Sequence, residues 1–138
     1  MGNGNLAVLK KILKFDCPVD YVYDYIDSNM DNYFKKSGDS IDCFMDTLPG
    51  TRFAIGYINN EFCGWIQYKC IEETMIIITA YNNSKQGREF SKQGWKEFVD
   101  YAKSKGCKKI RMKTMRNHRI MRKLYKFKTV ERIMETKI

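Results

Sequence analysis

A buried strand, a polar loop and a long helix follow one another in the middle of this sequence and form its segment best suited to bind a ligand. An apolar strand is predicted over 74–80, and a polar loop over 81–88 leads from it into a predicted helix over 89–104. The N–H groups and the positive dipole end of a helix N-terminus bind anions. Gly87 allows a ligand to approach the backbone, and Arg88 adds a positive charge. We expect the backbone here to open a gap in a sheet and to place a helix tip against a negative ligand.

The elements on either side predict an α/β fold in a single domain that covers residues 1–138. An Asn-rich link over 59–61 separates two β-rich runs, which is a hairpin signal. A strand, a helix and a strand in succession, at 74–80, 89–104 and 108–114, predict a β-α-β crossover with parallel strands. In the N-terminal part we expect a strand over 6–15, a helix over 19–27, a polar stretch over 29–38 that ends or interrupts that helix, and a short helix from Ser40 to a stop at Pro49-Gly50. Strands over 52–58, 62–71 and 74–80 follow, and then the helix over 89–104 with Gly106 as its C′ glycine. The chain is expected to continue with a strand over 108–114, a short basic helix over 117–125 and a strand over 129–138.

The positive charge of the sequence is concentrated in its last third. The whole chain carries a net charge of +9, but residues 103–138 contain 14 Lys and Arg against 2 Asp and Glu, a local charge of +12 that leaves −3 for residues 1–102. Such a segment suits nucleic acid, an acidic partner or an anionic cofactor. A solvated face of a Lys-rich protein has the same composition, so the charge alone leaves these alternatives open.

The cysteines indicate a reducing compartment rather than a metal site. The chain has 5 cysteines and 1 histidine, and no pair is spaced as Cys-x-x-Cys, so no metal is expected. We expect the cysteines to be reduced, small core residues. The N-terminus does not resemble a signal peptide and no apolar run is long enough to cross a bilayer, so a cytoplasmic protein without membrane contact is expected. The cysteines are Cys17, Cys43, Cys63, Cys70 and Cys107.

The order of elements and the C-terminal half, roughly residues 50–135, resemble the GCN5-related N-acetyltransferases. Gly64 stands where that family has a strand glycine, residues 101–114 (YAKSKGCKKIRMKT) look like its helix end, turn and next strand, and residues 86–91 (QGREFS) fall on its acyl-CoA segment, Arg/Gln-x-x-Gly-x-Gly/Ala. The resemblance implies a mixed central sheet of about six to seven strands with helices on both faces, and acetyl-CoA as cofactor.

The acyl-CoA segment departs from the family pattern, because Glu89 replaces the first motif glycine and Ser91 replaces the second small residue. A carboxylate near a pyrophosphate repels it, and its Cβ narrows the approach. Alternatively, Glu89 serves only as a favourable helix-start residue. A shifted register, in which Gly87 is the key glycine, lengthens the helix by two residues relative to the family.

The resemblance also implies site residues. Tyr125 matches the tyrosine that family members often use as general acid toward the leaving thiolate. In the competing register, which Phe127 sets, Tyr125 packs in the core and Arg122 falls at the acid position. Glu73 stands where the family sometimes places a carboxylate that serves as general base, although an exposed turn carboxylate is the alternative. The implied cofactor-binding residues are Thr79, Ala80, Tyr81, Gln86, Gly87, Arg88, Glu89, Phe90, Ser91 and Asn117, the last of which also suits a helix start.

Three functions fit these features. The first is an N-acetyltransferase that moves an acetyl group from acetyl-CoA to an amine of a small molecule or protein by direct attack. The second is a protein that kept this fold, lost the cofactor and serves a structural or interaction role. It would be loosely similar to acetyltransferase-like bacteriophage proteins, including internal virion components, and would lie in the virion with a virion protein as partner. The third is a basic nucleic-acid-binding module, although the sequence contains no recognisable motif for it.

Overall fold

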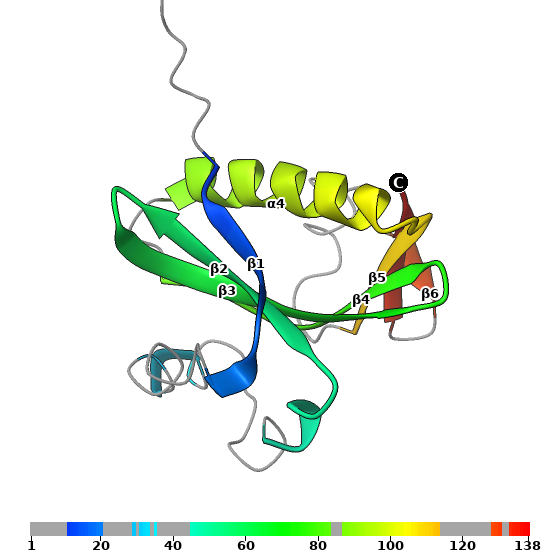
Figure 1. Cartoon of the computed structure of the whole chain (residues 1–138), viewed down its shortest axis with the longest axis horizontal. Helices are drawn as coiled ribbons and strands as arrows, with labels where there is room; N and C mark the ends of the chain where they lie inside the picture. Colours follow the sequence, from blue (N-terminus) through cyan, green and yellow to red (C-terminus); the bar gives the residue numbers. More distant parts are fainter. Residues whose placement is uncertain are drawn as a thin grey trace, which may run out of the picture.

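Seven strands form one mixed sheet in the order β1-β2-β3-β4-β5-β7-β6 (Figure 1). The computed structural model of the chain describes residues 11–20, 29, 31–33, 35, 45–83, 87–113, 128–130 and 133–138. β4 and β5 run parallel, and the other neighbouring strands pair antiparallel. The sheet confirms the expected α/β class and the parallel crossover. The strands are β1 (Leu13–Cys17), β2 (Arg52–Ile58), β3 (Glu61–Ile71), β4 (Thr74–Asn82), β5 (Lys109–Lys113), β6 (Lys128–Val130) and β7 (Ile133–Lys137).

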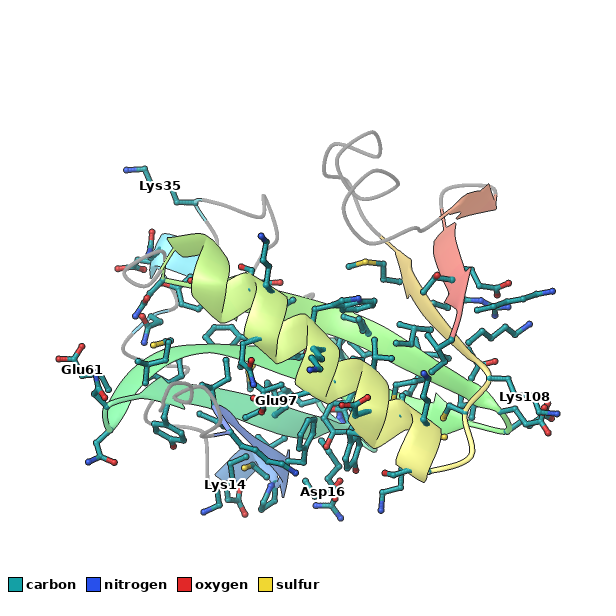
Figure 2. All side chains as sticks on the ribbon, turned by 90° about the horizontal axis from the view of Figure 1, so that it is seen from above. Lys14, Asp16, Lys35, Glu61, Glu97 and Lys108 are labelled. Atoms are coloured by element: carbon teal, nitrogen blue, oxygen red, sulfur yellow. The ribbon has the colours of Figure 1, made fainter. Side chains whose placement is uncertain are left out.

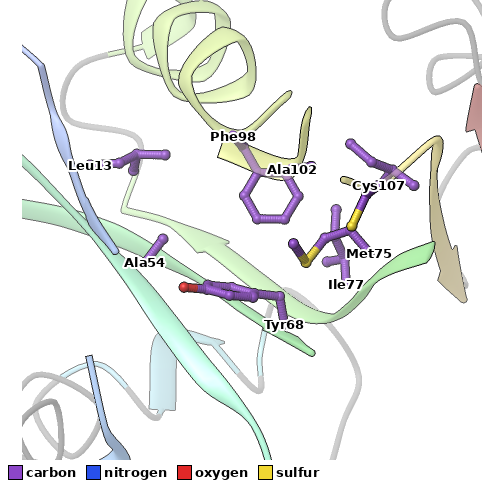
Figure 3. Packing of buried hydrophobic residues seen from close by; sticks show 9 residues of the cluster. Leu13, Ala54, Tyr68, Met75, Ile77, Phe98, Ala102 and Cys107 are labelled. Carbon is purple, nitrogen blue, oxygen red and sulfur yellow. The ribbon is translucent and has the colours of Figure 1, made fainter. Parts of the chain in front are cut away.

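The helix α4 (Gly87–Ser104) lies across one face of the sheet (Figure 1). Phe98 and Ala102 are four residues apart, so they share one face of the helix, and both are fully buried against the strands (Figure 3). After the helix Gly106 adopts a positive φ of 82°, and the Cys107 N–H donates to the Ala102 carbonyl at 3.0 Å, which confirms the expected C′ glycine. The core on this face consists of Leu13, Ala54, Tyr68, Met75, Ile77, Phe98, Ala102, Cys107 and Ile110.

A second, aromatic core covers the opposite face of the sheet. Tyr33 packs against Trp65 and Tyr81, with ring centroids 5.4 Å and 6.2 Å away. Asn32 Nδ2 donates to the Tyr81 hydroxyl at 2.6 Å, and that hydroxyl donates to Asn29 Oδ1 at 3.2 Å. The described residues of the 29–35 segment are helical. Helices therefore lie on both faces of the sheet, as expected.

An extra residue in β4 reverses which of its side chains face α4. The register between β3 and β4 shifts between Ile77 and Thr79, which leaves Ile78 as a bulge. Ile77, before the bulge, belongs to the core under α4, whereas Tyr81, an even number of residues later, belongs to the aromatic core. Without the bulge both would lie on the same face, because side chains alternate along a strand.

The N-terminal part differs from the sequence analysis in the bounds of its first strand and in a helical segment. The first strand is Leu13–Cys17 instead of 6–15, while residues 1–10 lie outside the described part. Glu97 of α4 sets where this strand begins, because its carboxylate accepts the N–H groups of Ile12 at 3.0 Å and Leu13 at 2.9 Å (Figure 2). In the polar stretch 29–38, the described residues 29, 31–33 and 35 are helical, which the sequence analysis did not predict, whereas the expected end or interruption of the preceding helix stays a prediction because residues 21–28 and 36–38 lie outside the described part. The contacts with the aromatic core that stabilise the helical residues are tertiary and leave no local pattern.

The C-terminal part contains one further error. The single strand expected over 129–138 is two strands, and β6 and β7 pair antiparallel with Val130 opposite Ile133. Residues 131–132 are Glu and Arg, which are not turn-forming types, so the sequence gives no sign of the reversal. β4 extends two residues beyond the predicted strand, to Asn82, and α4 begins two residues earlier, at Gly87. The short helix expected over 117–125 lies outside the described residues.

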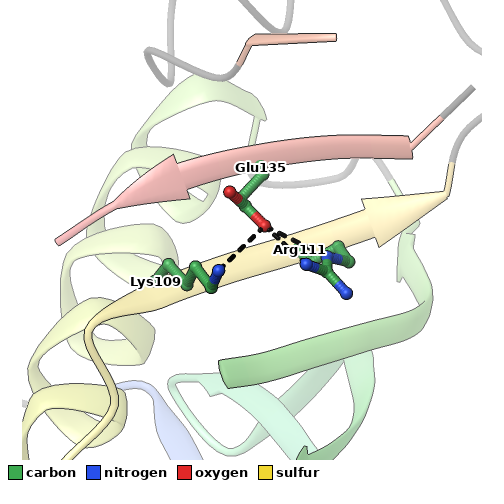
Figure 4. A network of polar contacts seen from close by, with 3 residues as sticks. All are labelled: Lys109, Arg111 and Glu135. Carbon is green, nitrogen blue, oxygen red and sulfur yellow. Dashed lines mark hydrogen bonds and ion pairs between the residues drawn. The ribbon is translucent and has the colours of Figure 1, made fainter. Parts of the chain in front are cut away.

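An ionic network centred on the Glu135 carboxylate joins β5 to β7 (Figure 4). Glu135 Oε1 accepts hydrogen bonds from Arg111 Nη2 at 2.8 Å and Arg111 Nε at 3.1 Å, and it lies 3.6 Å from Lys109 Nζ. The Glu135 side chain is 11% exposed. The hydrogen bonds from Arg111 hold the pKa of Glu135 below its ordinary value. The network stabilises the pairing of β5 with β7, the neighbour that β5 keeps along its whole length.

The cysteines differ from one another in exposure. Cys17, Cys63 and Cys107 are buried thiols, as expected. Cys70 is exposed near the end of β3, so the expectation of a core residue is wrong there, and Cys43 lies outside the described part. Among the described residues, no helix has both the length and the apolar composition needed to span a bilayer.

Candidate active site

β4 and β5 part in the middle of the sheet. Their parallel ladder joins Thr74–Ile77 to Lys109–Met112 and ends there, although β4 continues to Asn82 beside β3 and β5 continues to Lys113 beside β7. Within the described ranges, β4 beyond Ile77 therefore has a strand neighbour on one side only. Its other side is a backbone edge with which a ligand can form hydrogen bonds. We call this place, between Ile78–Asn82 and the end of β5, the β4–β5 opening.

The bulge explains where the opening begins. Ile77 is the last residue of β4 that pairs with β5, and Ile78 is the bulged residue that follows it. A bulge bends its strand and increases the local twist. β4 thus turns away from β5 directly after the last ladder pair, while it remains paired with β3.

Gly64 allows the last residues of β4 to stay close to β3. It pairs with Asn82, and a Cβ built on it would lie 1.9 Å from the carbonyl oxygen of Tyr81. No side chain fits at that distance, so only glycine is compatible with this approach. The Asn83 N–H also donates to the Cys63 carbonyl at 2.8 Å, which extends the contact past the end of the strand. The wall of the opening is therefore fixed to β3 at its far end.

The start of α4 lies beside the end of β4. Asn82 Nδ2 donates to Ser91 Oγ at 3.0 Å, which ties the last residue of the strand to the second turn of the helix. α4 begins at Gly87 and has 18 residues. The first four N–H groups of a helix have no partner within it, and its N-terminus carries a partial positive charge. A backbone edge and a helix N-terminus are thus brought together at one end of the opening.

The side chains of Thr79 and Tyr81 point to the face of the sheet that carries the aromatic core. Thr79 Oγ1 donates to Gln67 Oε1 at 2.8 Å and accepts from Trp65 Nε1 at 3.1 Å. Tyr81 is 3% exposed and its hydroxyl binds the two asparagines of the helical segment. Any contact of these two residues with a ligand in the opening therefore runs through their backbone. Ala80 between them is partly buried against the core under α4.

Gln67 forms a buried polar network that the sequence analysis missed. Its side chain is fully buried, and its Nε2 donates to Thr47 Oγ1 at 3.1 Å and to Thr51 Oγ1 at 3.0 Å. With Thr79 on its Oε1, the amide has partners on both atoms, as a buried amide requires. A glutamine in an otherwise β-rich run was the only signal available. The network fixes β4 just beyond the bulge.

Several predicted site residues are placed by their backbone alone or not at all. Gly87 to Phe90 form the first turn of α4, so Glu89 is a helix-start residue, and the side chains of this turn lie outside the described part. Gln86, Asn117 and Tyr125 also lie outside it, so their roles stay predictions.

Glu73, the predicted base, lies far from the opening. It belongs to the turn before β4, and its carboxylate forms an ion pair with Lys108 at 3.4 Å, with side chains 62% and 76% exposed, respectively. β4 has nine residues, which places its two ends roughly 25 Å apart. Figure 2 shows Lys108 at the opposite end of the sheet from Glu61 and the hairpin between β2 and β3. The structure does not bring Glu73 together with the other candidate residues.

A polar cluster of different character lies at the end of β1. Asp16 has a positive φ of 59°, and its Oδ1 accepts hydrogen bonds from the hydroxyls of Tyr68 at 3.0 Å and Tyr101 at 2.5 Å. Burial and the hydrogen bond to Asp16 raise the pKa of Tyr101 to about 12. Burial raises the pKa of Tyr68 as well. The cluster joins β1 to β3 through Tyr68 and to α4 through Tyr101, and both phenols stay neutral at neutral pH. Among the described residues, no group of three or more potential metal ligands comes together.

Solved structures show the same fold. The PaiA N-acetyltransferase of Thermoplasma acidophilum, in complex with coenzyme A, superposes with a TM-score of 0.63 at 14% identity over 91% of this chain and 99% of that chain. A GNAT family acetyltransferase of Elizabethkingia anophelis, with acetyl-CoA bound, gives 0.65 at 15% identity over 94% and 100%. The N-acetylglutamate synthase of Neisseria gonorrhoeae, complexed with coenzyme A and N-acetyl-glutamate, gives 0.67 at 11% identity over 93% of this chain and 35% of that chain.

The family itself is shown by the sequence. A search of curated proteins finds no match. The model of the acetyltransferase (GNAT) family matches residues 15–128, which include the whole segment from β2 to β5. The resemblance to bacteriophage proteins stays a prediction. The chain therefore belongs to the acetyltransferase (GNAT) family.

Proposed function

We propose that this protein transfers an acetyl group from acetyl-CoA to an amine by direct attack. The observation that carries the proposal is the β4–β5 opening. The parallel ladder stops at Ile77 and Met112, and the start of α4 lies beside the end of β4, which is paired with β3 but not with β5. An opening with a backbone edge on one wall and a helix N-terminus at its end suits a ligand with an amide-like chain and a phosphate group.

The residues at the opening fit such a cofactor in two respects. Gly64 keeps the end of β4 close to β3, which fixes the position of the backbone edge that forms the wall of the opening. Thr79 and Tyr81 direct their side chains to the other face, which leaves backbone N–H and C=O groups for hydrogen bonds. When bound, acetyl-CoA would supply the acetyl group as a reactive thioester. The backbone of Thr79 to Tyr81 would orient it through its carbonyl oxygen, as an oxyanion hole does, and the first turn of α4 would hold its pyrophosphate.

Two protons have to move in this reaction, one from the attacking amine and one to the leaving thiolate. Tyr125 is the proposed donor to the thiolate, on the strength of the family resemblance. Glu73 has no role in this proposal, because it lies at the opposite end of β4 and pairs with Lys108. Replacing Tyr125 by Phe should lower kcat by about 10²-fold or more while the affinity for acetyl-CoA stays within twofold. An unchanged kcat would assign Tyr125 to packing instead.

The transfer itself is tested by measuring coenzyme A release with a thiol reagent while acetyl-CoA and a panel of amines are supplied. Amino acids, polyamines and a lysine-containing peptide cover the small-molecule and protein classes of acceptor. A thermal unfolding series with acetyl-CoA reports binding separately from turnover, because a ligand that binds only the folded state raises its stability. The proposal predicts stabilisation by acetyl-CoA and amine-dependent release of coenzyme A. Absence of any stabilisation at millimolar acetyl-CoA would refute it.

A second candidate function is a structural or interaction role, in which the protein keeps this fold but no longer binds acetyl-CoA. One observation favours it. Glu89 lies in the first turn of α4, where its charge opposes a phosphate. Replacing Glu89 by Gln removes the charge and keeps the side-chain length, and replacing it by Gly also removes the Cβ. If the opening binds acetyl-CoA, both variants should bind it about 3- to 10-fold more tightly. Unchanged affinity would place the phosphate elsewhere, and no binding by either variant would support the second function.

A further inference from the structure

Two cysteines outside the candidate active site lie in contact with each other. Cys70 Sγ and Cys107 Sγ are 3.3 Å apart, although the residues are separated by 37 positions in the chain. Cys70 lies near the end of β3, and Cys107 lies between the C′ glycine of α4 and β5. Closing that gap to a disulfide, whose sulfur atoms are about 2.05 Å apart, requires a movement of little more than 1 Å.

The two thiols differ in a way that suits stepwise oxidation. Cys70 is exposed and can be reached by a reagent in solvent, whereas Cys107, in contact with it, is only 5% exposed. Burial and the hydrogen bond with Cys70 raise the pKa of Cys107 to about 11, so the buried thiol stays protonated at neutral pH. An oxidant therefore meets Cys70 first, and Cys107 is the partner already in place to resolve the product.

The positions of the two residues give the bond a structural consequence. All of β4 and α4, and with them the backbone of the β4–β5 opening, lie between Cys70 and Cys107 in the sequence. A bond between the two sulfurs would close a loop that contains both elements. It would join β3 directly to the connection between α4 and β5, at the Thr74 end of β4, where β4 and β5 are still paired.

We propose that Cys70 and Cys107 form a reversible disulfide when the protein meets a low-molecular-weight disulfide such as glutathione disulfide. The Cys70 thiolate attacks one sulfur of glutathione disulfide, so the reagent's S–S bond breaks and one glutathione leaves as a thiolate that takes up a proton. Cys107 loses its proton and attacks the Cys70 sulfur, so the mixed disulfide breaks and the second glutathione leaves. The protein pair gives up two electrons and two protons, and glutathione disulfide is reduced to two glutathione molecules. This modification site does not depend on the proposed acetyl transfer.

The test counts thiols in the full-length protein before and after incubation with excess glutathione disulfide, followed by removal of the reagent. Of the 5 thiols present, two should be lost, and proteolytic mass mapping should find the Cys70 and Cys107 peptides joined. A dithiol reductant should restore all of them. Because the bond closes a long loop, the oxidised form should unfold at a temperature on the order of 10 °C higher than the reduced form.

Three variants decide the assignment. Cys70→Ser, at an exposed position, and Cys107→Ala, which removes the buried thiol without adding a polar group, should each lose the cross-link. Cys63→Ala, which removes a buried cysteine of β3 that lies away from this pair, should keep it. Retention of all thiols in the native protein, a stable glutathione adduct on Cys70, or a cross-link that persists in Cys70→Ser would overturn the proposal.

Discussion

Gly64 offers the sharpest test of how the candidate site is built. Replacing it by Ala would place a Cβ 1.9 Å from the Tyr81 carbonyl oxygen, 2.9 Å from the Tyr81 carbonyl carbon and 3.0 Å from Asn82 Cα. All three are main-chain atoms of β4, so no side-chain rotation can relieve the contact. β3 and β4 must separate by roughly 1 Å at this point, and they would lose the ladder hydrogen bonds nearby.

The size of the effect follows from these terms. Overpacking typically destabilises by about 1–3 kcal/mol, and each weakened backbone hydrogen bond adds about 1 kcal/mol. In the opposite direction, alanine makes the unfolded chain less flexible than glycine does, which stabilises the folded protein by about 0.5–1 kcal/mol. We expect Gly64→Ala to lower the free energy of unfolding by about 2–4 kcal/mol in urea denaturation. Because the strain falls on the wall of the β4–β5 opening, the variant should also bind acetyl-CoA more weakly.

Gly94 supplies the matched control. It lies in α4, and a Cβ there would meet Ile12 Cδ1 at 3.8 Å, an ordinary contact. Gly94→Ala should therefore leave stability unchanged or raise it by up to about 1 kcal/mol, since alanine favours the helix. If Gly64→Ala stays within about 0.5 kcal/mol of the wild type, the close approach of β4 to β3, and with it the described shape of the opening, is wrong.

Three further outcomes are expected. Glu97→Gln should lower the free energy of unfolding by about 1–3 kcal/mol, because the amide NH₂ of glutamine would face backbone N–H groups at the start of β1 that need an acceptor. The control Asp100→Asn, at an exposed position of the same helix, should change the free energy of unfolding by less than about 0.5 kcal/mol. Tyr101 should ionise near pH 12 in an ultraviolet titration, and the stability that its neutral phenol contributes should be complete below pH 10 and be lost as the pH rises toward 12. Normal ionisation near pH 10 would contradict the hydrogen bond to Asp16. Because the pKa of Glu135 is lowered in the folded protein, the stability that its carboxylate contributes should be present above its unfolded pKa of 4.5 and should be lost as the pH falls through its folded pKa. Arg111→Met should remove this loss of stability in acid.

The sequence predicted those parts of the fold that depend on local pattern. The strands at β2, β3 and β5, the parallel crossover and the C′ glycine at Gly106 are confirmed, because alternation, helical periodicity and a left-handed glycine each leave a local mark. The helical segment at Tyr33, the start of β1 and the hairpin of β6 and β7 were missed. Each depends on partners distant in the chain or on a reversal without turn residues.

The candidate site divides in the same way. A buried strand followed by a loop and a helix could be read from the sequence, and so could the unusual Glu89. The bulge at Ile78 could not, because it arises from the register between two strands and leaves no trace in residue types. Gly64 was recognised as a strand glycine, but the carbonyl that requires it belongs to Tyr81, which only the fold brings near.

Backbone amide shifts followed by NMR during titration with acetyl-CoA test the central claim most directly. The β4–β5 opening predicts that the largest changes fall on the amides of residues 78–82 and 87–91, on the bulged half of β4 and the start of α4. The amides of residues 74–76, which pair with β5 at the closed end, should change little. Changes confined to other parts of the chain, or none at saturating acetyl-CoA, would contradict the account.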